Sequence, residues 1–279
     1  MVPIDFSQVS LNALDFAATI AHKTSAEILL LHVVESYEYN TGLKEVINPD
    51  NAVEKEIQKK LDDLRTENTN LWGIRIKTLL TKGKIHRQIQ KAQKDQNIDL
   101  IIMGTTGASG TSGFGRYFLG SNAHRTVNIS ECPVITMRKG NHSKEIKHIV
   151  VPFDLQKETT QKVSFAIKLA KTFGSTIHVI SVTGFFDEFK HSIDTVKLRL
   201  DEIAGQISKE GIKVTTKMLR QKDIAETVME YAKVVNADLT IIMTRAEKKF
   251  NEIFLGSNAR TIVTTSELPV MSLHPKKVG

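Results

Sequence analysis

The sequence predicts an α/β protein built from two tandem domains, each a doubly wound, five-stranded parallel sheet. Two observations indicate this fold class: short apolar runs alternate with helical patterns, and the whole series occurs twice along 279 residues. The runs 28–31 and 100–103 are apolar throughout, which is typical of strands buried on both faces of a parallel sheet. We expect five strands and four helices per copy, and right-handed crossovers then give an open sheet.

The repeat is visible as three collinear blocks of similar sequence. Three blocks in the same order cannot plausibly arise by chance, so the chain contains two copies of one domain. We predict domains over residues 1–140 and 145–279, with the boundary in the polar stretch 138–147, which contains Gly140 and Asn141. The blocks pair residues 2–5 with 151–154, residues 99–100 with 238–239, and residues 118–123 with 254–259.

Helical patterns lie between the strands of each copy. Ser10 is the expected N-cap of the first helix, and Gly174 is a good C-cap for its counterpart in copy two. The first strand of copy one is predicted to be short, because only two residues precede Pro3, whereas residues 146–151 lead into Pro152. Further helices are expected over residues 53–68, 86–96, 159–173 and 187–209.

The composition argues against several classes of protein. Basic residues exceed acidic ones by seven, but they are scattered along amphipathic helices, so we expect no nucleic-acid partner. Cys132 is the single cysteine, which rules out an intrachain disulfide and fits a reducing compartment. No apolar run reaches the length of a membrane span, and no leader peptide is recognisable. We therefore expect a cytoplasmic protein without a membrane partner.

A glycine-rich stretch over residues 104–115 follows the apolar run 100–103 and leads to Gly120-Ser121-Asn122. Glycines allow close backbone approach, successive amides bind anions, and a helix N-terminus attracts phosphate. A flexible surface loop with a serine cap is the alternative, but the position after a parallel strand favours ligand binding. The stretch is not a Walker A loop, which needs Gly-Lys-Ser/Thr, and it does not follow the first strand as a dinucleotide fingerprint would.

Taken together, these features resemble the universal stress protein family. The resemblance rests on Val-Pro-x-Asp-x-Ser at residues 2–7, on the glycine loop with its later Gly-Ser pair, and on Cys-Pro-Val at residues 132–134. It implies a Rossmann-like fold and, in the ATP-binding branch, ATP or another adenine nucleotide, often with a divalent metal such as Mg²⁺. The resemblance implies Asp5 and Val33 at the adenine, Gly104 and Gly107 along the ribose and phosphate path, and Gly120, Ser121 and Asn122 at the phosphates.

The two copies differ in this loop. Twelve residues separate Gly107 from Gly120, three more than the family pattern, although a literal match exists in a register that uses Gly110. Comparison with copy two favours a three-residue insertion within residues 108–115. Copy two has Met243 and Ala246 in place of the two loop glycines, and Glu247 would repel phosphate. We therefore predict that copy two does not bind nucleotide.

Several side chains near the predicted site have structural interpretations. Asp5 is also an ordinary helix-capping residue, so a capping role stays open beside the adenine role. His32 is interpreted as a satisfied sheet-end histidine and Cys132 as a small buried apolar residue. His86 and Arg116 are interpreted as solvated side chains, with the ligand crevice as the alternative position for each.

The expected function is a stress-response regulator that binds an adenine nucleotide through copy one. Copy two is expected to act as an internal partner, with strands 134–137 and 270–273 meeting in a pseudo-dimer that could pair further as a homodimer. Two alternatives stay open. One is a nucleotide-free interaction scaffold, in which the insertion blocks the pocket. The other is a slow ATP-hydrolysing enzyme, although no base is evident beside the loop.

Overall fold

The computed structural model describes residues 1–35, 51–105, 120–140, 145–154, 159–183, 193–221, 223–246 and 253–275. Copy one contains β1 (Val2–Pro3), α1 (Gln8–Thr24), β2 (Ile28–Val34), α2 (Asn51–Trp72), β3 (Ile76–Lys82), α3 (Ile85–Asp95), β4 (Ile101–Gly104), α4 (Ser121–Ile129) and β5 (Val134–Met137). Copy two contains β6 (His148–Phe153), α5 (Thr159–Phe173), β7 (Thr176–Thr183), α6 (Ile193–Lys209), β8 (Val214–Arg220), α7 (Ile224–Val234), β9 (Leu239–Met243), β10 (Arg245–Ala246), β11 (Ile253–Phe254), α8 (Ser257–Thr265) and β12 (Val270–Leu273).

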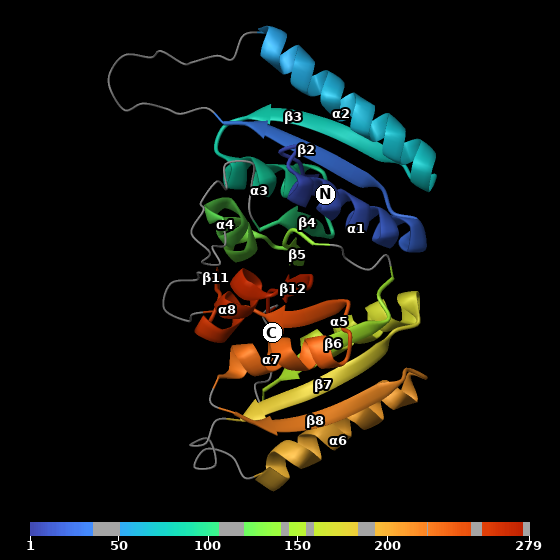
Figure 1. The fold of residues 1–279 in the computed structure, drawn as a ribbon, viewed down its shortest axis with the longest axis vertical. Helices are drawn as coiled ribbons and strands as arrows, with labels where there is room; N and C mark the ends of the chain where they lie inside the picture. The colour runs from blue at the N-terminus through green and yellow to red at the C-terminus, as the bar shows by residue number, and fades with distance from the viewer. Residues whose placement is uncertain are drawn as a thin grey trace, which may run out of the picture.

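The strands of the two copies follow the same spatial order. Copy one reads β3-β2-β1 and then β4-β5, and copy two reads β8-β7-β6-β9-β12, with parallel pairing inside each copy. The chain therefore reverses its direction of winding between β1 and β4, and again between β6 and β9. In such doubly wound sheets, ligands bind at this switch point, outside the carboxyl ends of the strands. Figure 1 shows the copies stacked along the long axis of the molecule, and the predicted fold class is confirmed.

The first strand of copy one is short, as predicted. It spans two residues and pairs only with β2, at Val2 with Leu30 and Pro3 with Leu31. The connection to β4 runs through Met1, whose terminal amine donates to the Leu100 carbonyl at 2.8 Å and whose carbonyl accepts from the Ile102 amide at 3.0 Å. Burial lowers the pKa of this amine to about 6.

Two apolar clusters cover the two faces of the sheets. One contains buried residues of α1, α2, α5 and α6, and the other contains buried residues of α3, α4, α7 and α8. Each cluster includes side chains from both copies, because the strands that carry them form one continuous layer across the junction. Representative residues are Leu14, Leu61, Val163 and Leu200 in the first cluster, and Ile89, Val127, Val228 and Ile262 in the second.

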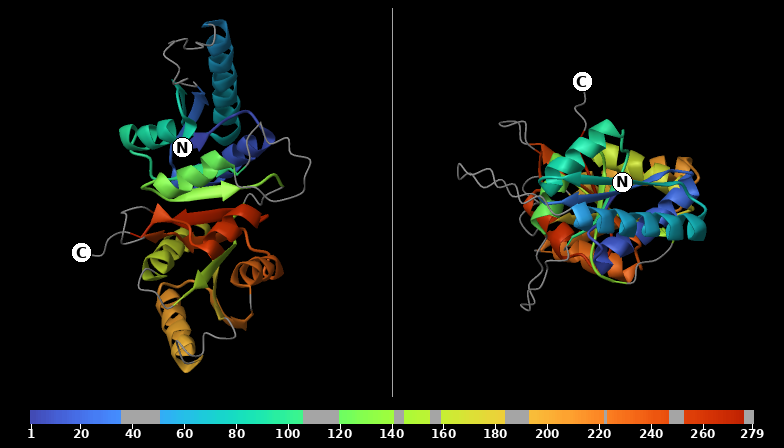
Figure 2. Two further views of the ribbon diagram at one scale, coloured as in Figure 1. Left: turned by 90° about the vertical axis from the view of Figure 1, so that its left-hand side faces the viewer. Right: turned by 90° about the horizontal axis from the view of Figure 1, so that it is seen from above.

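The copies meet through their final strands, β5 and β12. These strands pair antiparallel, with Ile135 opposite Met271, and extend one sheet over seven strands from β4 to β8. The left view of Figure 2 shows β5 and β12 side by side at the centre of the molecule. The predicted meeting of residues 134–137 and 270–273 is confirmed, with element bounds identical to those expected.

Two local predictions need correction. The N-cap of α1 is Ser7, whose hydroxyl accepts from the Ser10 amide at 3.3 Å, so the assignment of Ser10 as the cap was wrong. Phe6 adopts a positive φ of 62°, and this sharp turn lets the helix begin three residues earlier. Copy two also contains a short antiparallel pair, β10 with β11, that the sequence pattern did not predict.

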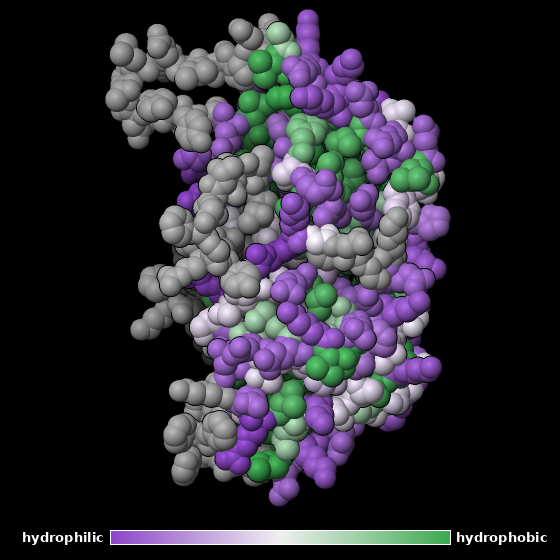
Figure 3. All heavy atoms as spheres, in the orientation of Figure 1, coloured by the Kyte–Doolittle hydropathy of each residue, from purple (hydrophilic) through white to green (hydrophobic). Residues whose placement is uncertain are grey.

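On the face drawn in Figure 3, hydrophilic residues cover most of the described area and hydrophobic residues form small separate groups. None of the helices in the described segments combines the length and the apolar character that crossing a bilayer would require.

One difference between the copies gives a stability prediction. The Asp238 carboxylate accepts from the amides of Lys147 and His148 at 2.7 and 2.9 Å, at the entry to β6. Its repeat mate, Asp99, makes no such bond to a described main-chain amide. Asp238→Ala should therefore lower the free energy of unfolding by about 1–3 kcal/mol in a urea titration. The matched Asp99→Ala variant should change it by less than about 0.5 kcal/mol, and equal losses in the two variants would contradict a special role for Asp238.

Candidate functional site

Four cavities are candidate sites within the described residues. The two larger ones lie away from the carboxyl ends of the strands: one of about 360 Å³ beside Met1 and Asp99, and one of about 590 Å³ beside Lys139 and Pro269. The other two lie at the switch points of the two copies, with volumes of about 180 and 190 Å³. We call these the copy-one cavity and the copy-two cavity, and they are the stronger candidates because ligands of doubly wound sheets bind there.

The copy-one cavity brings together six of the seven predicted site residues, while Gly107 lies outside the described residues. They come from the ends of β1, β2 and β4 and from the start of α4, which explains why residues far apart in sequence meet here. The six are Asp5, Val33, Gly104, Gly120, Ser121 and Asn122. The sequence pattern did not predict Ser10, His32, Ile85, Met103 and Thr105 in this lining; only their nearness to strand ends and helix starts hinted at it.

Asp5 bonds Ser7, the N-cap residue of α1. Its Oδ1 atom accepts from the Ser7 hydroxyl at 2.6 Å and from the Ser7 amide at 3.0 Å, just before α1 begins. Asp5 thus has a structural role beside the helix start, although the cap itself is Ser7. The same residue lines the cavity, so a contact with a ligand stays a prediction.

His32 is held as a neutral side chain at the edge of the cavity. Its Nδ1 lies 2.7 Å from the Ile4 carbonyl, so this nitrogen donates a hydrogen bond and Nε2 is left as an acceptor. Burial lowers the pKa of the imidazole, and the ring packs at 5.1 Å from that of Phe6. The interpretation as a satisfied sheet-end histidine holds, but His32 also lines the cavity.

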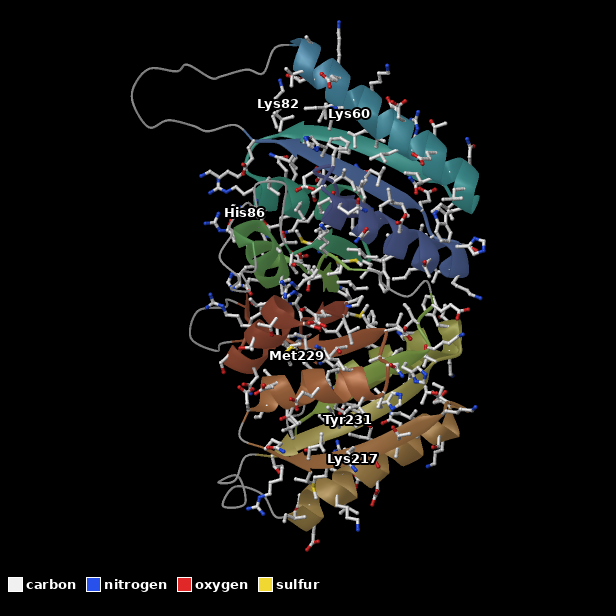
Figure 4. The ribbon with its side chains drawn as sticks, viewed as in Figure 1. Lys60, Lys82, His86, Lys217, Met229 and Tyr231 are labelled. Atoms are coloured by element: carbon white, nitrogen blue, oxygen red, sulfur yellow. The ribbon has the colours of Figure 1, made fainter. Side chains whose placement is uncertain are left out.

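His86 and Cys132 do not belong to this lining. His86 is the second residue of α3 and is labelled in Figure 4; its neighbour Ile85 lines the cavity instead. Burial and the nearby Arg125 charge lower the pKa of His86. Cys132 is 7% exposed, and burial raises the pKa of its thiol to about 11, as suits a buried apolar residue. Arg116 lies outside the described residues.

The start of α4 offers free amides to the copy-one cavity. The Gly120 amide is already used, because it donates to the Thr105 carbonyl at 2.7 Å. The first bond inside the helix is from the His124 amide to the Gly120 carbonyl. The amides of Ser121, Asn122 and Ala123 therefore have no acceptor among the described residues, and no side chain caps them at Gly120.

Thr105 adds an unpaired hydroxyl to the same cavity. The residue is 2% exposed, and its Oγ1 has no hydrogen-bond partner among the described residues. Its repeat mate Thr244 is 1% exposed, but the Thr244 hydroxyl lies 3.1 Å from the Leu273 carbonyl and 2.8 Å from Nδ1 of His274. A buried hydroxyl without a partner costs free energy, and Thr105 is one of the residues that line the copy-one cavity.

The copy-two cavity has the same framework with different chemistry. Pro152, Asp154, Val182, Gly256 and Ser257 line it, as their repeat mates line the copy-one cavity. Met243 replaces Gly104, and Lys162 enters the lining at a position where copy one has Ala13. The loss of glycine has therefore not closed the cavity.

Comparison with known proteins agrees with the fold and with the repeat. Residues 1–138 and 145–274 each match the universal stress protein family. The universal stress protein MJ0531 of Methanocaldococcus jannaschii is 33% identical over 144 residues, covering 50% of this chain and 81% of that protein. A universal stress protein of Archaeoglobus fulgidus has a TM-score of 0.77 at 20% identity, covering 100% of this chain and 96% of the other.

Part of the chain also matches a solved complex. The structure of an Archaeoglobus fulgidus universal stress protein with dAMP aligns to 45% of this chain and 96% of that one, with 22% identity and a TM-score of 0.36.

Proposed function

This chain belongs to the universal stress protein family, and we propose that its first domain binds an adenine nucleotide in the copy-one cavity. The observation that carries the proposal is a set of donors without a partner among the described residues, in the lining of that cavity: the first amides of α4 and the buried Thr105 hydroxyl. Backbone amides at a helix N-terminus, with the positive end of the helix dipole, form a natural phosphate site.

The donors match a phosphate group in number and in kind. The amides of Ser121, Asn122 and Ala123 provide three N–H groups, and the Thr105 hydroxyl can add an O–H donor. Phosphate oxygens accept hydrogen bonds only, and bonds to a charged acceptor are about twice as strong as neutral ones. A bound phosphate would therefore accept hydrogen bonds from both the first amides of α4 and the Thr105 hydroxyl.

The other end of the cavity suits a base. Asp5, His32 and Val33 come from the ends of β1 and β2, and they supply a carboxylate, a ring acceptor and peptide groups. An exocyclic amine needs acceptors, and ring nitrogens need donors such as a peptide N–H. Adenine is the base that the family resemblance implies, and this lining contains both kinds of group.

A divalent ion such as Mg²⁺ fits this site only as a companion of the phosphates. Within the described residues, no group of three His, Cys, Asp or Glu side chains gathers to hold a metal, and Asp5 is the single acidic residue of the cavity lining. Mg²⁺ commonly keeps several water ligands and binds phosphate oxygens. The ion would then shield phosphate charge without a protein cage. The proposed role is a nucleotide-responsive regulator, in which copy two serves as the internal partner through β12.

The proposal is tested by binding stoichiometry. The full chain should bind close to one ATP or AMP per chain in isothermal titration, and an adenine nucleotide should be detected by mass spectrometry in protein purified without added ligand. Absence of nucleotide after purification together with no titratable binding of ATP, AMP or dAMP would contradict the proposal.

A matched pair of threonine variants tests the phosphate end. Thr105→Val removes the unpaired hydroxyl with little change of shape, so it should weaken nucleotide binding about fivefold, close to 1 kcal/mol, while leaving thermal stability unchanged or slightly raised. Thr244→Val removes a satisfied hydroxyl, so it should lower stability by about 1 kcal/mol and leave nucleotide affinity unchanged. Equal nucleotide affinity in wild type and Thr105→Val would show that the Thr105 hydroxyl does not bond the nucleotide.

A further inference from the structure

Copy two carries a buried lysine that has no counterpart in copy one. Lys162 lies in the first turn of α5, is 5% exposed and lines the copy-two cavity. Its repeat mate, Ala13, is fully buried and does not line the copy-one cavity. An ammonium group is rarely buried without a charged partner, because its desolvation costs several kcal/mol.

The surroundings of Lys162 satisfy only part of its hydrogen-bonding capacity. Its Nζ atom donates to the Pro152 carbonyl at the end of β6, while an ammonium has three donors. Burial lowers the pKa of Lys162 to about 8, and the nearby Asp154 carboxylate opposes this shift. Within the described residues, no other acceptor bonds the ammonium, and Lys162 lines a cavity of about 190 Å³.

A second source of positive potential faces the same cavity. Gly256 and Ser257 begin α8, and the first bond inside this nine-residue helix is from the Arg260 amide to the Gly256 carbonyl. No side chain caps the helix at Gly256, and the amides of residues 257–259 have no acceptor among the described residues. A helix N-terminus and a buried ammonium therefore point into one space, and both favour an anion.

Most of the other side chains in the lining are apolar, with Asp154 and Asn258 as polar members, and this composition narrows the choice of ligand. Val182, Val228, Ile242, Met243 and Ile262 surround the charged groups. We propose that copy two binds a small organic anion, with a carboxylate or phosphate group between Lys162 and the N-terminus of α8 and an apolar body against these side chains. The Lys162 side chain reaches the Pro152 carbonyl, next to Asp154, on the side where copy one has Pro3 and Asp5. The two cavities thus select different ligands, and Lys162 excludes a nucleobase from the second.

The test is isothermal titration calorimetry of the full chain at pH 8, with butyrate and inorganic phosphate as probes. Buffers with different ionisation enthalpies reveal how many protons are taken up on binding. Near its pKa about half of the Lys162 amines are neutral, so binding of an anion should take up close to half a proton per site. Lys162→Met removes the charge at similar length and should weaken binding of the preferred probe at least about tenfold and abolish the proton uptake. Lys168→Met makes the same change at an exposed position of α5 and should match wild type.

The outcomes separate a binding site from a lysine that merely fills space. Binding of either probe that depends on Lys162 but not on Lys168, with nucleotide binding by copy one intact, supports the proposal. Failure of both probes to bind wild type, or equal binding by Lys162→Met, overturns it. A wild-type stoichiometry of two nucleotides per chain would also overturn it, since a nucleobase would then enter beside Lys162. Because Met packs well in an apolar environment, cooperative unfolding of Lys162→Met should be retained.

Discussion

Ile135→Asp should destabilise both domains at once and cost far more stability than an exposed substitution. Ile135 is fully buried in β5, where it pairs with Ile102 of β4 and with Met271 of β12. A carboxylate at this position has no cationic partner opposite it in either neighbouring strand, and burying an unpaired charge costs several kcal/mol. We expect a loss of about 4 kcal/mol or more, which is a large part of the stability of a typical domain.

Two spectroscopic signals report this loss of stability: Trp72 fluorescence for copy one and circular dichroism for the whole chain. Trp72, the single tryptophan, lies at the end of α2 in copy one, and far-ultraviolet circular dichroism reports on the whole chain. Both midpoints of urea unfolding should fall in Ile135→Asp. Ile135→Val should cost about 0.5–1.5 kcal/mol, and Thr216→Asp on the exposed β8 strand should change stability by less than about 0.5 kcal/mol. A variant in which only the copy-one signal shifts would show that the β5–β12 pairing does not couple the domains.

Ser121→Pro should weaken nucleotide binding at least about tenfold without unfolding the protein. Ser121 is the first residue of α4, a position where proline is well tolerated because the missing amide would have no helical partner. The preceding Gly120 has φ −54° and ψ 141°, which is the conformation favoured before proline. The substitution thus removes one proposed phosphate donor while preserving the helix, and one hydrogen bond to a charged group is worth about 1.5–3 kcal/mol.

The repeat supplies the control for this variant. Ser257→Pro makes the same change at the start of α8, where Gly256 has φ −56° and ψ 159°. It should leave nucleotide affinity unchanged and weaken binding of the small anion in copy two. Thermal melts should agree with wild type for both variants. Unchanged nucleotide affinity in Ser121→Pro would show that the phosphates do not bind at the N-terminus of α4.

Local pattern predicted the framework of the candidate site but not its chemistry. The apolar runs located the strands, the rule for doubly wound sheets placed the glycine stretch that leads to Gly120 at the ligand edge, and the family resemblance implied Asp5 and Val33 there. The structure brings the three residues together. Two features were not predictable: the use of the Gly120 amide by the Thr105 carbonyl, and the unpaired Thr105 hydroxyl. Both depend on contacts between residues that are far apart in sequence, such as Thr105 and Gly120. Local hydrophobic periodicity does not predict such contacts.

The sequence alone determined the twofold repeat and the α/β class, whereas the pairing of the final strands was expected from the family resemblance. The repeat and the class follow from hydrophobic periodicity and from the duplicated blocks, because burial of an apolar face is a property of the local pattern. Only the tertiary structure decided the difference between the two cavities. Thr105 and Thr244 are the same residue type, yet His274 lies beside the Thr244 hydroxyl while that of Thr105 is unpaired among the described residues. Lys162 lines a pocket to which its helix, α5, contributes no other residue. The hydrogen-bonding and charge state of a buried polar group depends on its neighbours in space, and these come from the whole fold.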